Sequence, residues 1–87
     1  MPYRIEEHPK VSRLIRKNPE LRGLWEQRRS SLESSPRFGQ GIQHLRYEYQ
    51  CNYRLRLHVW RLLYEVDDES NAVRVYRARL RDDAYDP

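Results

Sequence analysis

The residues of this chain best suited to chemistry are arginines that alternate with apolar residues between Asn52 and Val66. Arg54 and Arg56 alternate with apolar side chains, and Arg61 follows after a short break. Because successive side chains of a strand point to opposite faces, this spacing predicts a β-hairpin with one apolar face and one face that displays guanidinium groups. Like charges on neighbouring strands cost energy unless an anion neutralises them. The pattern favours a surface that receives a phosphate or carboxylate over an ordinary solvated sheet face.

The distribution of charge along the chain supports this interpretation. Of 17 basic residues only Lys10 and Lys17 are lysines, and arginine is the side chain that binds phosphate through two parallel hydrogen bonds and stacks on bases. The acids of the second half concentrate in two clusters, Glu65–Glu69 and Asp82–Asp86, and leave the strands between them basic. Such a distribution is typical of a polyanion-binding surface.

Other classes of site are not supported by the sequence. Cys51 is the only cysteine, so an internal disulfide is excluded, and His8, His44 and His58 do not have the spacing of metal ligands. No apolar run approaches the ~20 residues of a membrane span, and the N-terminus lacks the pattern of a signal peptide. We therefore expect a cytoplasmic protein with no metal, no cofactor and no membrane contact.

The first half of the chain predicts a strand followed by two helices. Period-two alternation indicates a strand over residues 3–6, and helical periodicity begins at Lys10. Asn18 is the expected N-cap of a second helix that begins at Pro19. The short connection predicts an antiparallel helical hairpin. The apolar residues assigned to the core are Val11, Leu14, Ile15, Leu21, Leu24, Trp25 and Leu32.

The second half predicts a loop and then three strands. Residues 34–41 form the loop, and the pattern of residues 47–51 leaves open whether a strand begins there. The expected strands and turns are 53–57, a tip at His58, 60–66, a polar turn at 67–71, and 72–81.

A change of phase in the last strand predicts a β-bulge. Val73 and Val75 are spaced by two, but Ala78 and Leu80 have the opposite phase. A bulge near Tyr76 and Arg77 would reconcile them and redirect the arginines at 77, 79 and 81. Residues 1–87 are thus expected to form one domain of α+β class, with an N-terminal strand, an antiparallel helical hairpin and a three-stranded antiparallel meander in one twisted sheet.

Five segments in order carry a resemblance to a known family: Tyr53-Arg54-Leu55-Arg56-Leu57, Trp60-Arg61-Leu62-Leu63-Tyr64-Glu65-Val66, Asp67-Asp68, Val73-Arg74-Val75 and Arg81-Asp82-Asp83-Ala84-Tyr85. This ordered set resembles the RelE/ParE superfamily of small bacterial toxins from type II toxin-antitoxin systems. The resemblance implies a RelE-like fold. It also implies a hetero-oligomer with a cognate antitoxin encoded by a neighbouring gene.

The resemblance further implies a chemistry, because RelE-type members are taken to cleave mRNA in the ribosomal A site and so to inhibit translation. In that endoribonuclease reaction the ribose 2′-hydroxyl attacks its neighbouring phosphate. The residues that would stabilise the phosphorane or match the family tyrosine are Arg54, Arg56, Arg61, Arg81 and Tyr85. The candidate proton carriers are His58 and Tyr85, because arginine does not give up its proton. The residues expected to bind RNA phosphates are Arg46, Arg77 and Arg79.

Two other functions stay open at this point. A ParE-like member of the same fold would inhibit DNA gyrase without nuclease activity. A non-catalytic basic module would hold RNA or an acidic protein segment. All three functions predict an acidic partner that covers the cationic surface. The target would be the ribosome with its mRNA for the nuclease, and DNA gyrase for the ParE-like alternative.

Overall fold

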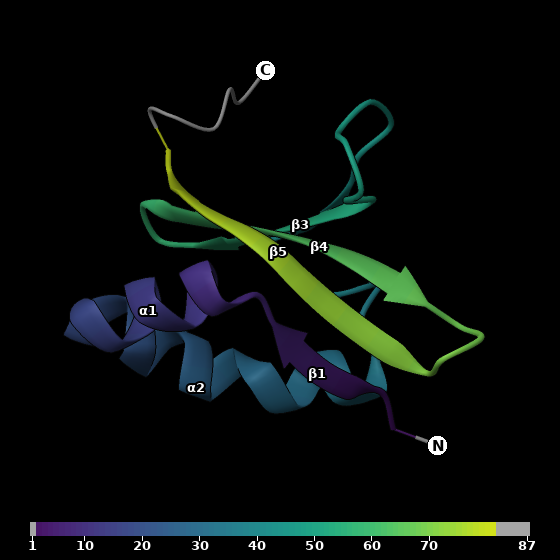
Figure 1. Ribbon diagram of the computed structural model, residues 1–87, viewed down its shortest axis with the longest axis horizontal. Helices are drawn as coiled ribbons and strands as arrows, with labels where there is room; N and C mark the ends of the chain where they lie inside the picture. Colours follow the sequence, from purple (N-terminus) through teal and green to yellow (C-terminus); the bar gives the residue numbers. More distant parts are fainter. Residues whose placement is uncertain (1, 82–87) are drawn as a thin grey trace.

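The computed structural model describes residues 2–81, which form one mixed sheet of five strands with two helices on one face (Figure 1). The elements in chain order are β1 (Arg4–Glu7), α1 (Pro9–Lys17), α2 (Pro19–Ser34), β2 (Ile42–His44), β3 (Tyr53–Leu57), β4 (Trp60–Asp67) and β5 (Ala72–Leu80). The strand order across the sheet is β1-β5-β4-β3-β2. The α+β class predicted from the sequence is therefore confirmed.

The core lies between the helices and the face of the sheet that they cover. Val11 and Ile15 of α1 are buried, as are Leu21, Trp25 and Leu32 of α2. The sheet contributes the remaining buried members, Leu55, Leu57, Leu62, Tyr64, Val66, Val73 and Val75. Full burial of such a side chain contributes roughly 1.5–3 kcal/mol, so these stripes hold both helices on the sheet.

Asn18 connects the two helices, and its side chain caps the first of them. Its backbone occupies the predicted N-cap position of α2, but its side chain makes no capping hydrogen bond there. Asn18 Nδ2 instead donates to the carbonyl oxygen of Leu14 at 2.8 Å. Carbonyls in the last turn of a helix lack intrahelical donors, and this bond satisfies one of them. The predicted position of the helix start is right, while the expected side-chain cap is wrong.

β3 and β4 form the predicted hairpin, and β5 contains the predicted bulge. Across the hairpin Arg56 lies opposite Arg61, and the turn contains His58 in the left-handed region at φ 58°. Between β4 and β5, Leu63 pairs with Arg77 and Tyr64 pairs with Val75. Tyr76 is thus the extra residue that shifts the register.

Two pairings of the sheet were not predicted. The short strand β2 adds to the edge of β3 with Gln43 opposite Arg54, so the meander has a further strand beside it. β1 pairs in parallel with β5, with Ile5 opposite Val73. Residues 47–51 do not form a strand; they belong to the segment Leu45–Asn52, which stands on the side of the sheet away from the helices (Figure 1).

Candidate functional site

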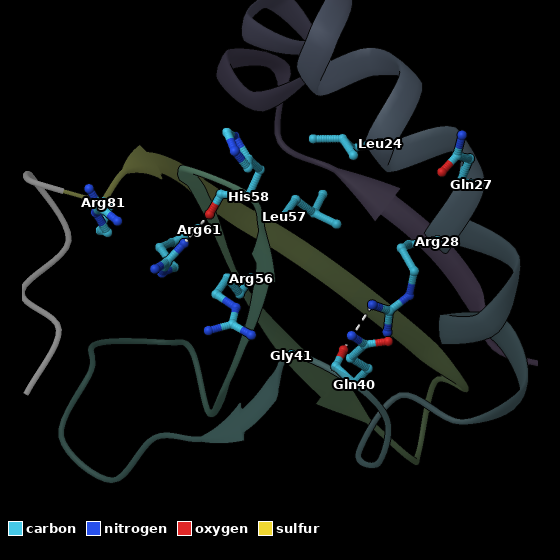
Figure 2. Close-up of a pocket in the computed structure, with 10 residues that line it drawn as sticks. All are labelled: Leu24, Gln27, Arg28, Gln40, Gly41, Arg56, Leu57, His58, Arg61 and Arg81. Atoms are coloured by element: carbon cyan, nitrogen blue, oxygen red, sulfur yellow. Dashed lines mark hydrogen bonds between the residues drawn. The ribbon is translucent and has the colours of Figure 1, made fainter.

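A cavity of about 480 Å³ lies beside the hairpin turn, where β3 continues past the first residue of β2 and faces α2. Its lining residues are Leu24, Gln27, Arg28, Gln40, Gly41, Arg56, Leu57, His58, Arg61 and Arg81. Figure 2 shows Arg56, Arg61 and Arg81 along one side of the cavity, and Arg28 with Gln40 on the opposite side. None of these described lining residues is acidic, so the cavity is suited to an anion.

Arg61 is held in place by backbone carbonyls of the hairpin turn. Its Nη1 donates to the carbonyl oxygens of His58 at 2.8 Å and Trp60 at 3.0 Å. The residue is only 3% exposed, which corrects the expectation that Arg61 is displayed on the open face of the sheet. A buried cation needs hydrogen-bond acceptors, and the carbonyls of a tight turn supply them. These bonds fix the orientation of the guanidinium in the cavity wall.

Arg56 stands directly opposite Arg61 on the neighbouring strand and is exposed. Its backbone N–H donates to the carbonyl oxygen of Gly41 at 2.9 Å. Gly41 has φ +79°, and a Cβ at this position would approach the carbonyl oxygen of Arg56 to 3.0 Å. The loop can therefore pass this close to Arg56 only with a glycine.

His58 and Arg81 complete the side of the cavity nearest the turn. His58 Nδ1 lies 3.1 Å from Glu20 Oε1 in the first turn of α2. The backbone N–H of Arg81 donates to the carbonyl oxygen of Val59 at 2.7 Å, which attaches the end of β5 to the turn. The hairpin turn thus positions His58, Arg61 and Arg81 together.

Arg54 does not line the cavity, although four arginines were expected to converge there. Its partner across the sheet is Gln43 of β2, and Arg54 Nη2 donates to Gln43 Oε1. The lining of the cavity includes Arg56, beyond the last β3 residue that pairs with β2, while this contact holds Arg54 beside β2. Tyr85, the fifth predicted catalytic residue, lies outside the described residues 2–81.

The arginines predicted to bind RNA lie on or beneath the Leu45–Asn52 segment. Arg77 Nη1 and Arg79 Nη2 are each 3.6 Å from Glu48 Oε2. Arg77 Nη1 also donates to the carbonyl oxygen of Tyr49 at 2.7 Å. Arg46 is an exposed residue of the segment. These three arginines are separate from the cavity lining.

Sequence reasoning missed the wall of the cavity that α2 provides. Arg28 Nη1 donates to the carbonyl oxygen of Gln40 at 2.8 Å, which joins the helix to the following loop. One signal could have found it, because Arg28 occupies the stripe of Leu21, Leu24 and Leu32 at helical spacing. A charged residue within an apolar stripe indicates a place where the helix faces a polar cavity.

The loop that carries Gln40 and Gly41 is anchored to the core by a buried tyrosine. Tyr64 is fully buried, and its hydroxyl donates to the carbonyl oxygen of Pro36 at 2.6 Å. Burial raises the pKa of Tyr64 well above its ordinary value, because the phenolate would lose its hydration. The neutral hydroxyl is thus a permanent donor to this loop.

Residues 2–81 contain no cluster of three or more His, Cys, Asp or Glu side chains that could hold a metal ion. In the same part of the chain no helix has the length and apolar character to cross a membrane.

The comparisons with known proteins give matches among solved structures. No family model matches the chain, and a search of curated proteins finds no match. The archaeal RelE-RelB complex from Pyrococcus horikoshii OT3 matches with 22% identity and a TM-score of 0.79, over 97% of this chain and 100% of that one. The toxin-antitoxin complex RelBE2 from Mycobacterium tuberculosis matches with 28% identity and a TM-score of 0.71, over 93% and 100%.

The isolated RelE toxin of E. coli matches with 25% identity and a TM-score of 0.73, over 90% of this chain and 83% of that one. All three matches span the helices and the sheet together, as their coverage requires. This chain therefore has the RelE-like fold and is similar, across nearly its full length, to RelE toxins of RelBE toxin-antitoxin complexes.

Proposed function

We propose that this chain is the toxin of a toxin-antitoxin pair and acts as a RelE-type, ribosome-dependent mRNA endoribonuclease. The observation that carries the proposal is the convergence of Arg56, Arg61 and Arg81 on one cavity in a fold similar to that of RelE toxins. Fold alone does not decide an activity, so the argument rests on what these side chains can do to a phosphate.

The proposed reaction is an internal transfer within the RNA backbone. The ribose 2′-oxygen forms a bond to the neighbouring phosphorus, and the bond from phosphorus to the 5′-oxygen breaks. The products are a 2′,3′-cyclic phosphate and a 5′-hydroxyl end, and no co-reactant is consumed. The phosphorane carries extra negative charge, which preoriented guanidinium groups stabilise. Arg61 suits this role because two carbonyls already hold its guanidinium before any RNA binds.

The reaction also needs groups that move two protons, one from the 2′-hydroxyl and one to the leaving oxygen. Arginine keeps its proton, so the cavity arginines cannot act as the general base or the general acid. His58 contacts Glu20 through Nδ1, and Nε2 is the atom through which it would exchange a proton with RNA. Tyr85 remains the other predicted proton carrier.

We further propose that an antitoxin covers the cationic surface. Matched structures include complexes of RelE with RelB. The cavity has four arginines in its described lining, so an acidic segment that folds onto it would be electrostatically complementary. A cotranscribed neighbouring gene for such a protein is expected.

Induced expression followed by mapping of RNA ends in translated messages tests the nuclease. We expect new 5′-hydroxyl ends with the intact protein and a loss of roughly 10²–10³ in their rate of formation with Arg81→Gln. Arg13→Gln is the matched control, because Arg13 is an exposed arginine of α1 outside the cavity. Intact messages together with double-strand DNA breaks would contradict the nuclease and assign the chain to gyrase inhibition.

A further inference from the structure

Two strongly exposed tyrosines, two positions apart in the sequence, belong to the Leu45–Asn52 segment, which connects β2 to β3. Tyr47 is 96% exposed and Tyr49 is 73% exposed. Single exposed aromatic residues are common, but two in one short loop form a patch that commonly contacts a partner. The proposed cleavage chemistry uses neither ring.

The segment presents these rings on an ordered backbone. Arg77 Nη1 donates to the carbonyl oxygen of Tyr49 and also contacts Cys51 Sγ at 3.1 Å. Glu48 lies within ion-pair distance of Arg77, and Cys51 is only 3% exposed. Glu48, the backbone of Tyr49 and Cys51 therefore contact the sheet, while the side chains of Tyr47 and Tyr49 are exposed.

Further contacts fix the ends of the segment. The backbone N–H of Leu45 donates to the carbonyl oxygen of Asn52 at 2.9 Å, which closes the base of the loop. Gln50 adopts the left-handed region at φ 64°, which turns the chain back toward β3. A loop held at its base and its middle loses little conformational freedom when its exposed rings bind a ligand.

The surroundings of the two rings are cationic. The guanidinium carbon of Arg77 lies 6.0 Å from the centroid of the Tyr49 ring, and Arg46 is exposed beside Tyr47 in the sequence. Arg79 adds a third positive charge and lies 3.6 Å from Glu48. Aromatic rings interleaved with arginines are typical of surfaces that bind single-stranded nucleic acid, where the rings stack on bases and the arginines follow the phosphates.

We propose that Tyr47 and Tyr49 form a base-stacking platform for single-stranded RNA. Arg79 contacts Glu48 of this segment and pairs across the sheet with Arg61, so RNA held on the platform lies beside the cavity in which the proposed cleavage occurs. The proposal rests on the proposed function in taking RNA as the ligand, and it adds where the nucleotides that flank the reacting phosphate are held. The arginines beside the two tyrosines favour RNA over an apolar protein surface as the occupant of the platform.

Fluorescence anisotropy with a short fluorescein-labelled single-stranded RNA and the full chain tests the platform. Loss of a base-aromatic stack typically weakens binding by roughly 5- to 150-fold, and we expect this for Tyr47→Ala and for Tyr49→Ala. Tyr47→Phe and Tyr49→Phe keep the ring and should bind like the intact protein. Phe38→Ala is the matched control, because it removes a 78% exposed ring from a different loop.

A second probe, a ribose-phosphate chain of the same length without bases, separates stacking from charge. The intact protein and both alanine variants should bind this probe equally. Unchanged RNA affinity in both alanine variants, or an equal loss on the probe without bases, would overturn the platform and leave the tyrosines to a protein partner or to the fold of the loop.

The two proposals fail in different ways. If the alanine variants lose RNA affinity and the unmodified protein leaves messages intact in cells, the platform is supported and the nuclease is contradicted. Cleaved messages in cells, with RNA affinity unchanged by both alanine substitutions, remove the platform and keep the nuclease.

Discussion

Arginines at the two ends of the sheet differ in whether carboxylates surround them within residues 2–81. Near β1, Arg74 makes ion pairs with Glu6 at 3.1 Å, Glu65 at 3.1 Å and Asp67 at 2.7 Å. At the hairpin turn, within residues 2–81, no ion pair to a carboxylate involves Arg56 or Arg81, and both line the cavity. Arg74 thus connects strands through carboxylates, whereas no described carboxylate pairs with the exposed Arg56 in the cavity lining.

The largest expected effect comes from replacing one arginine at each end of the sheet and comparing the two variants. Arg56→Gln should lower the rate of ribosome-dependent cleavage by roughly 10²–10³, because one oriented cation is lost from the transition state. Thermal unfolding should change little, since Arg56 is exposed. The measurement is the cleavage rate in a purified translation system.

Arg74→Gln is the matched substitution at the other end and should leave this cleavage rate unchanged. A rate loss in Arg74→Gln as large as that in Arg56→Gln would show that general charge, and not the position of the cation in the cavity, controls the activity.

The anchor of the cavity loop should have the next largest effect. Tyr64→Phe removes the donor to the buried carbonyl of Pro36, and leaving such an acceptor unsatisfied costs about 1–3 kcal/mol. Urea unfolding at neutral pH measures the change in the free energy of unfolding. Tyr53→Phe is the control, because Tyr53 is a less buried tyrosine stacked on Tyr64. Equal stabilities of the Tyr64→Phe variant and the intact protein would mean that the loop needs no anchor.

Glu48 neutralises part of the positive charge of Arg77 and Arg79, as three carboxylates do for Arg74. Its removal therefore tests whether arginines without a nearby carboxylate bind anions better. Glu48→Gln should tighten binding of single-stranded RNA by roughly 2- to 5-fold, because two arginines lose a competing carboxylate. The affinity should also fall more steeply with salt concentration. Anisotropy at two salt concentrations measures both effects. Weaker binding would instead show that Glu48 acts chiefly by holding the segment in place.

The smallest expected effect is a pH-dependent loss of stability in Arg74→Gln. Hydrogen bonds from Arg74 and from the Ser70 backbone hold the pKa of Asp67 at about 2, below its ordinary value of 3.8. A carboxyl group whose pKa is lowered by folding stabilises the protein above its unfolded pKa, and this contribution disappears as the pH falls through the folded value. The urea midpoint of the variant should therefore lie below that of the intact protein at pH 6.

The difference between the two midpoints should narrow as the pH falls from about 4 to about 2. Arg74→Lys keeps the positive charge and should lie between them. A difference in urea midpoint that stays constant from about pH 4 to about pH 2 would show that Arg74 stabilises the protein through packing and not through its ion pair with Asp67.

The sequence predicted the elements of this fold better than their pairing. The hairpin and the bulge were predictable because alternation and its change of phase are local properties of residues 53–80. β2 has only three residues and no clear alternation, so nothing local distinguishes it from a loop. The parallel contact between β1 and β5 joins distant parts of the chain, and the sequence of neither strand indicates which strand it pairs with.

The candidate site was predicted in part for the same reason. Arg56 and Arg61 were identified from strand alternation, and the structure places both in the cavity. The burial of Arg61 depends on carbonyls of the turn, which carry no sequence signal. Arg54 has the same alternation as Arg56 but faces β2, whose existence was not predicted.

The pairing of β1 with β5 affects the order of events during synthesis of the protein. Residues 4–7 leave the ribosome early, but their partners at residues 72–75 emerge only when most of the chain has been made. Until then β1 lacks its neighbour and the apolar side of the helices lacks most of its cover. The parallel pair that completes this edge of the sheet therefore forms only after the rest of the fold's residues have been synthesised.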